Sequence, residues 1–236
     1  MSVSYKALTS VHALNGLLRN RVLRWQGHPG TTLGDYRVQS NDDHRRELLQ
    51  LLVSLLVLLR SRNFQVDEHL LMTAVWHHDD AEDFGMGDTL SPLKNVNHDV
   101  AEYNLFCRVI QPNVSAEEWA HLERAFLLQF ATKHRENTQF SDGSREIMAN
   151  LVTMRPAEVL IFEFLERLDY LMYAVEQATD KSNPHFIREV YPNQARKLDD
   201  LLKRLPELKG FYWREPIGTY CETVISSFGP LVIQAA

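Results

Sequence analysis

Apolar residues recur at three- and four-residue spacing through most of this chain. That period matches one face of an α-helix, whereas the alternating runs typical of half-buried strands are hard to find. The pattern therefore predicts an all-α helical bundle. Helices are expected at about residues 4–23, 43–62, 67–79, 95–110, 116–131, 144–154, 157–180, 185–205 and 217–227.

The length of 236 residues favours a single domain, because one hydrophobic core grows until a chain reaches roughly 250 residues. We expect residues 1–236 to form that domain, with residues 185–236 as a C-terminal helical extension. The apolar run from Leu48 to Leu59 is too short to span a bilayer, and the N-terminal residues lack the apolar core of a signal peptide. These features predict a protein without a membrane partner.

A formal charge of −6 supplies no basic field for a nucleic acid duplex or an anionic membrane. An anionic substrate must then be met by local Arg, Lys or metal charge. The two cysteines, Cys107 and Cys221, are too few for a disulfide framework and lack the spacing of metal ligands. A reducing, cytoplasmic location is the simplest interpretation.

Four ionisable residues, His77 to Asp80, end the apolar stretch LLMTAVW. Such groups are costly at the edge of a core unless they are paired or bound to a cation. Imidazole and carboxylate together suit a divalent transition ion, although a His-Asp pair alone is weak evidence because the helix dipole also favours His at a C-terminus. His77 is interpreted as a residue that orients the ligands rather than as a ligand.

The wider pattern resembles the HD-domain superfamily, whose signature is an isolated His, a His-Asp pair about 35 residues later, and an acid on a distant helix. The matches here are His44 in SNDDHRRELL, then His78 and Asp79, and an acid in FEFLERLDYLMYAVE. The 34 residues between the two histidines suffice for a helix, a turn and a returning helix. The resemblance implies an HD-type helical bundle that holds one divalent ion, which is Co, Mn, Fe, Ni, Zn or Mg.

Within the superfamily the chain is most similar to the 5′-deoxynucleotidase group, which continues HDxxE with a Gly-Asp and a P-x-K element. This chain reads His78-Asp79-Asp80-Ala81-Glu82, then Gly87-Asp88, then Ser91-Pro92-Leu93-Lys94, with one extra residue before the Gly-Asp. An Arg24-Trp25 pair precedes the first His in the same way. The likeness covers about residues 14–110 well and 157–180 moderately.

This resemblance implies that the chain hydrolyses a phosphomonoester, such as a nucleoside 5′-monophosphate, with metal-activated water. Glu82 would orient or deprotonate the water, and Asp88 would assist the leaving group or grip the sugar. Arg24 and Lys94 would neutralise phosphate charge. Trp25 would pack on the sugar, although an aromatic anchor of the first helix is an equal alternative. The implied partner is a nucleotide or another small phosphorylated substrate, and a homodimer stays open.

The fourth ligand departs from the family pattern. Aligning the distant helix through Ala174 and Glu176 puts Glu166 where the family has Asp, while Asp169 lies one turn further on the same face. Either Glu166 replaces the usual ligand or Asp169 takes over. A second string, His98-Asp99-Val100-Ala101-Glu102, repeats HDxxE, but no Gly-Asp or P-x-K follows it, and we do not interpret it as the site.

Two other functions compete with a nucleotidase. The string His78 to Asp83 also satisfies the HDxxED pattern of alarmone-type pyrophosphohydrolases, although the Gly-Asp and P-x-K continuation favours the nucleotidase. The altered fourth ligand also fits a catalytically weakened HD scaffold that senses nucleotides or binds a protein. Metal content separates these classes.

Overall fold

The structure is a computed structural model that describes residues 22–88, 94–211 and 213–227. In this part of the chain the secondary structure is helical, and the strand-like pairing is an isolated antiparallel bridge between Leu23 and Ser40. The predicted all-α fold is confirmed. Among the described helices, none is long and apolar enough to cross a membrane. Most of the helix expected at residues 4–23 lies outside the described residues.

The described chain divides into two compact units. The first comprises residues 38–165 and the segment before Gly27, and the second comprises residues 27–37 and 166–236. The α-helices of the first unit are α3 (Asn41–Ser61), α4 (Glu68–His77), α5 (Val96–Ile110), α6 (Ala116–Leu127), α7 (Ala131–His134) and α8 (Asp142–Met154). Helix α9 (Pro156–Asp180) contributes its residues 156–165 to this unit.

Helix α3 begins at a capping box, in which the Ser40 hydroxyl accepts from the backbone N–H of Asp43 and the Asp43 carboxylate accepts from that of Ser40. A leucine stripe then follows at helical spacing, including Leu48, Leu52, Leu55 and Leu59, each fully buried. His44 lies four residues before Leu48, at the N-terminal end of this stripe. The helix period therefore turns His44 into the core.

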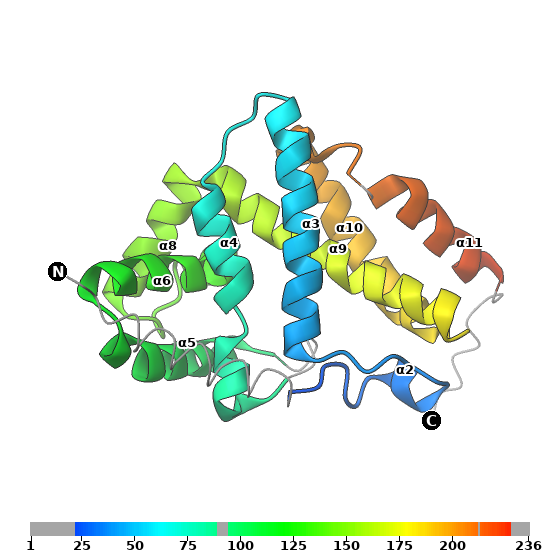
Figure 1. The fold of residues 1–236 in the computed structure, drawn as a ribbon, viewed down its shortest axis with the longest axis horizontal. Helices are drawn as coiled ribbons and strands as arrows, with labels where there is room; N and C mark the ends of the chain where they lie inside the picture. Colours follow the sequence, from blue (N-terminus) through cyan, green and yellow to red (C-terminus); the bar gives the residue numbers. More distant parts are fainter. Residues whose placement is uncertain (1–21, 89–93, 212, 228–236) are drawn as a thin grey trace. The chain divides into compact units, whose positions relative to one another are not determined.

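Helix α4 runs back beside α3 after a connection at residues 62–67 (Figure 1). Its cap is Asp67, whose side chain accepts from the N–H of Leu70. The buried face contains Leu71 and Val75, and His78 follows at the same spacing. Because the two helices are antiparallel, the start of α3 meets the end of α4, which brings His44 and His78 together.

A π-helical turn, Glu82–Met86, follows α4. Gly85 and Gly87 have φ values of 122° and 71°, a backbone region that favours glycine. A Cβ at either position would meet nothing within 4 Å, so conformation rather than space calls for glycine. Asp88 follows two residues after the turn, and its carboxylate accepts a hydrogen bond from the backbone N–H of Trp25 at 3.0 Å.

The second unit contains α2 (Pro29–Thr32), residues 166–180 of α9, α10 (His185–Arg204) and α11 (Thr219–Ser227). Phe186 of α10 stacks on His28 with 4.7 Å between ring centroids. A Cβ on Gly30 would lie 2.7 Å from the same phenyl ring, so this contact requires glycine. Asn183 donates to the carbonyls of Gly30 and Asp35 and ties the loop down.

The described helices agree with the predicted ranges to within a few residues, with one larger departure. The helix predicted at 116–131 ends at Leu127, and a 3-10 turn (Leu128–Phe130) separates it from α7. Apolar residues continue through this break and are buried, so the periodic pattern does not reveal it. The last turn of a helix is often 3-10 in form, which a periodic apolar pattern does not indicate.

Candidate metal centre

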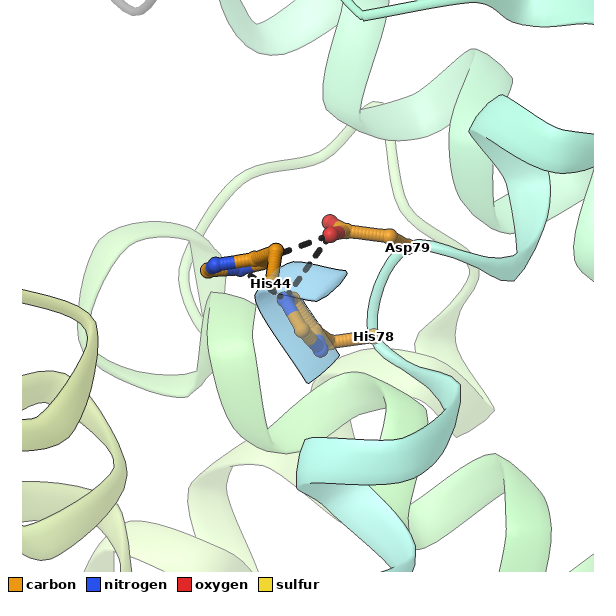
Figure 2. A group of neighbouring side chains, drawn as sticks. All are labelled: His44, His78 and Asp79. Carbon is orange, nitrogen blue, oxygen red and sulfur yellow. Dashed lines mark hydrogen bonds and ion pairs between the residues drawn. The ribbon is translucent and has the colours of Figure 1, made fainter. Parts of the chain in front are cut away.

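His44, His78 and Asp79 converge in the first unit (Figure 2). One donor atom from each lies within 4.8 Å of the others. The two Nε2 atoms are 3.1 Å apart, and Oδ2 of Asp79 lies 3.1 Å from Nε2 of His78 and 3.6 Å from Nε2 of His44. The three side chains that the sequence assigned as ligands are thus brought together.

The spacing of these atoms fits a shared ion. Ligand atoms ~2.1 Å from one divalent ion, at angles of about 90–110°, are separated by roughly 3.0–3.4 Å. The separations between these three donors fall in or near that interval. Two imidazole nitrogens and one carboxylate oxygen also form a common donor set for a divalent transition ion. The residues present therefore fit a metal.

A hydrogen bond orients the ring of His78. Its Nδ1–H donates to the carbonyl oxygen of Val75 at 2.9 Å, which leaves Nε2 to face Asp79. The phenyl ring of Phe162 packs edge-on against His78 at 5.6 Å. Such contacts fix the tautomer and the ring orientation of a ligand.

Asp79 also binds Arg24, with 2.9 Å between Nη1 and Oδ2. Backbone pairing places this arginine, because Arg24 N–H donates to the Gln39 carbonyl immediately before α3. Burial alone would raise the pKa of Asp79, but its contacts with His78 and Arg24 hold that pKa well below its ordinary value. Asp79 is therefore a buried, ionised carboxylate.

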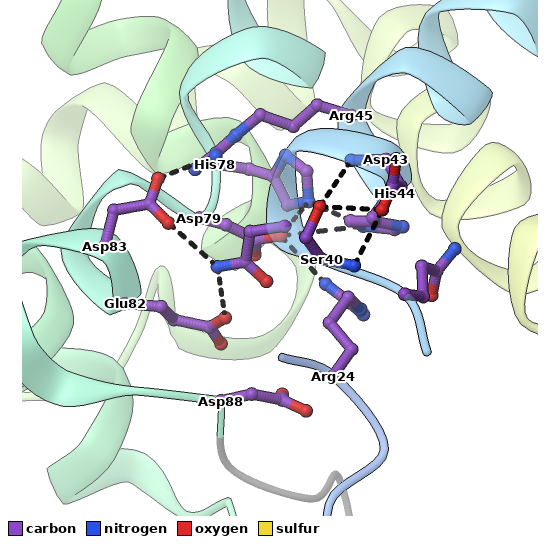
Figure 3. A network of polar contacts seen from close by, with 12 residues as sticks. Arg24, Ser40, Asp43, His44, Arg45, His78, Asp79, Glu82, Asp83 and Asp88 are labelled. Carbon is purple, nitrogen blue, oxygen red and sulfur yellow. Dashed lines mark hydrogen bonds and ion pairs between the residues drawn. The ribbon is translucent and has the colours of Figure 1, made fainter. Parts of the chain in front are cut away.

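Glu82 lies beside this group (Figure 3), and both of its carboxylate oxygens accept hydrogen bonds. Asn41 donates to Oε2 at 3.1 Å, and Lys94 donates to Oε1 at 2.9 Å. Burial and the charge of Asp79 raise the pKa of Glu82, while Lys94 and Arg24 oppose the rise. A fixed carboxylate with a raised pKa is a suitable proton acceptor.

A second network surrounds Arg45, which is fully buried. Its guanidinium lies 3.3 Å from Asp80 and 2.6 Å from Asp83. Asp80 in turn lies 2.6 Å from Nδ1 of His77, and the role of His77 in orienting the ligands stays a prediction. Burial raises the pKa of Asp83 to about 6 against the opposing charge of Arg45. This network fixes the segment that carries the ligands.

Negative charge is in excess around the site. Six carboxylates lie in it or at its edge, those of Asp79, Asp80, Glu82, Asp83, Asp88 and Glu102. Three cationic side chains accompany them, those of Arg24, Arg45 and Lys94. A divalent cation would offset part of this negative charge.

The remaining predicted residues have these positions. The indole of Trp25 is buried and donates from Nε1 to Gln39 at 2.9 Å, and both its substrate role and its role as an anchor of the first helix stay predictions. Pro92 lies outside the described residues. Glu166 and Asp169 belong to the second unit, where Asp169 is buried and Glu166 is half-buried. Which of them is the fourth ligand stays a prediction.

The repeated string at His98 forms different contacts. Asp99 pairs with His134 at 2.5 Å, and Glu102 lies 3.2 Å from Lys94. Within the described residues, the group able to hold a metal is the one at His44. Sequence reasoning did not foresee the roles of Asn41, Arg45 and Glu102. A signal existed for the first two, since both lie in the cap segment that carries His44.

No family model and no curated protein matches this chain. Its fold is similar to those of two solved structures from archaea. A conserved hypothetical protein from Pyrococcus furiosus has 16% identity and a TM-score of 0.48 over 80% of this chain and 99% of its own. A protein from Pyrococcus horikoshii has 19% identity and a TM-score of 0.49 over 85% and 99%.

Proposed function

We propose that this chain is a metal-dependent phosphohydrolase of the HD type that releases phosphate from nucleoside 5′-monophosphates. The observation that carries the proposal is the convergence of His44, His78 and Asp79, with donor atoms 3.1–3.6 Å apart. The resemblance to 5′-deoxynucleotidases supports the substrate class. The metal is an expected cofactor, and its identity is a matter for experiment.

The residues around the site have complementary roles in this proposal. A bound divalent ion would supply Lewis-acid polarisation and a lowered pKa of water. Glu82 accepts the proton of the attacking water, because its carboxylate is fixed beside the ligands. Arg24 and Lys94 offset the charge of the substrate phosphate, and Asp88 lies at the sugar or leaving-group side. Buried surroundings strengthen each of these electrostatic interactions.

The Gly-Asp and P-x-K continuation after Glu82 favours the nucleotidase over the alarmone-type alternative. Asp83 is the second acid of the HDxxED string, and its side chain contacts Arg45 and Asn41. In this arrangement Asp83 supports the structure around Glu82. The sensing scaffold remains the alternative if the protein binds metal and nucleotide without turnover.

The test combines metal analysis with an assay of phosphate release. Purified protein is analysed for bound metal, stripped with a chelator, and reloaded with Co, Mn, Fe, Ni, Zn or Mg. It is then assayed on ribo- and deoxyribonucleoside monophosphates and on a guanosine 5′-diphosphate 3′-diphosphate. We expect orthophosphate from monophosphates, and Glu82→Gln should reduce kcat by about 10²–10⁴-fold with metal retained.

Three results would contradict the proposal. Release of pyrophosphate from guanosine 5′-diphosphate 3′-diphosphate, with no orthophosphate released from the monophosphates, would favour the alarmone-type reaction. Nucleotide binding without hydrolysis would favour the sensor. Protein that takes up none of these ions would exclude the metal site itself.

A further inference from the structure

Lys94 lies between two buried carboxylates. Its Nζ is 2.9 Å from Oε1 of Glu82 and 3.2 Å from Oε1 of Glu102. The two glutamates are only 2% and 5% exposed. One ammonium group is therefore shared between a carboxylate next to the metal ligands and a second carboxylate on α5.

Glu102 has a high electrostatic cost at this position. Burial raises its pKa to about 7, and the negative charge of Glu82 adds to the rise, while Lys94 opposes it. A neutral residue of similar size would avoid that cost. Glu102 takes no part in the proposed hydrolysis. The presence of a carboxylate at this buried position therefore calls for an explanation.

The side chain of lysine explains why a second anchor is useful. Its ammonium ends a flexible four-carbon stem, so a single ion pair fixes its position poorly. Asn41 holds one oxygen of Glu82 from α3, and Lys94 holds the other from the segment before α5. A contact from Glu102 on the other side restricts Lys94 to the position in which it bonds Glu82.

We propose that Glu102 is a positioning residue that holds the ammonium of Lys94 against Glu82 and so fixes the carboxylate that activates water. This inference rests on the proposed function, because it assigns Glu82 to that step. Glu102 itself touches neither the substrate nor the three metal ligands. It acts through Lys94.

The first test is Glu102→Gln, which keeps the shape of the side chain and removes its charge. We expect kcat to fall about 10- to 100-fold, because small displacements of a reacting group are costly. KM and metal content should stay within about twofold, and Glu102→Asp should recover part of the loss. The matched control is Glu123→Gln, which removes a carboxylate bonded to Tyr103. It should leave kcat unchanged.

A double-mutant cycle with Lys94→Met tests the route of the effect. If Glu102 acts through Lys94, Glu102→Gln has no further effect on kcat once Lys94 is Met. Independent, multiplying effects would overturn the proposal, and so would a loss confined to KM or to metal content.

The same four proteins are compared by denaturant unfolding, which needs no substrate. Non-additive effects of the two substitutions on the free energy of unfolding would show that Glu102 holds Lys94. Additive effects would overturn the contact and, with it, the inference. Wild-type protein that shows the coupling but hydrolyses no phosphate ester would overturn the proposed function, and with it the catalytic consequence of the contact.

Discussion

Two arginines show how differently the two units use the same chemistry. Arg45 and Arg214 each bind two carboxylates. In the first unit Arg45 and its partners, Asp80 and Asp83, have fully buried side chains. In the second unit Arg214 is 51% exposed and binds Asp199 and Glu222, which are also partly exposed. The contacts are alike, but Arg45 is shielded from solvent whereas Arg214 is exposed to it.

The difference indicates what each cluster is for. A buried ion pair loses hydration that its Coulomb attraction repays only in part, so it is weak evidence for stability. The Arg45 network instead lies against the ligand segment, since Asp80 binds both Arg45 and His77. The Arg214 cluster lies near solvent, where ion pairs contribute little. Costly burial therefore marks the candidate metal centre.

Loss of a metal ligand should have the largest effect. His78→Ala removes one of three convergent donors, and we expect loss of bound metal and of measurable turnover, checked by metal analysis and phosphate release. The matched control is His98→Ala, in the repeated HDxxE string. Equal loss of metal from both variants would show that the cluster at His44 is not the site.

Breaking the buried pair should come next. Arg45→Met leaves Asp80 and Asp83 without their buried cation, and we expect a loss of about 3–5 kcal/mol in the free energy of unfolding. The control is the neighbouring Arg46→Met, because Arg46 is exposed and its pair with Asp42 follows helical spacing. It should change stability by less than about 0.5 kcal/mol. Denaturant unfolding measures both, and similar losses would contradict the comparison.

The pH dependence of stability should follow Glu102. Its folded pKa of about 7 lies above its ordinary value of 4.5, so the folded state holds the proton more tightly. The resulting stabilisation is complete below pH 4.5 and is lost as pH rises through 7. Relative to wild type, Glu102→Gln should therefore gain up to roughly 3 kcal/mol between pH 4 and pH 8. A pH-independent difference in unfolding free energy would refute this.

The fourth ligand should have a smaller effect than loss of His78. The alignment favours Glu166, so Glu166→Gln should weaken metal affinity about tenfold or more. Asp169→Asn should then leave the affinity near that of wild type. Titration of the metal-free protein measures both. The reverse order would assign the ligand to Asp169, and small equal effects would mean that neither binds the ion.

Removing the exposed arginine should have the smallest effect. Arg214→Ala breaks two surface ion pairs, and we expect a change of about 0–1 kcal/mol in unfolding free energy. Arg214 also lies over the Trp213 ring, 5.1 Å from its centroid, which adds to the upper end of this range. Metal binding and turnover should not change. A loss as large as that of Arg45→Met would show that exposure does not distinguish the two clusters.

The sequence predicted the ligand cluster but not its supporting contacts. His44 and His78 were paired through the resemblance to the HD-domain superfamily, and their spacing of 34 positions leaves room for a helix, a turn and a returning helix. By contrast, the Lys94–Glu102 pair joins a loop lysine to a helix residue that sequence reasoning had placed in a discarded string. Nothing in the local pattern indicates which carboxylate such a flexible side chain will meet.

The sequence by itself determined most of the helices and the helical face that Glu166 and Asp169 share. The reason is that helical periodicity acts over three or four residues, a range that the sequence shows directly. Only the tertiary structure decided that Asn41 and Lys94 hold Glu82, and that Arg45 is buried between Asp80 and Asp83. These contacts join segments up to 41 residues apart. They depend on helix packing and on side-chain rotamers, which local sequence patterns do not encode.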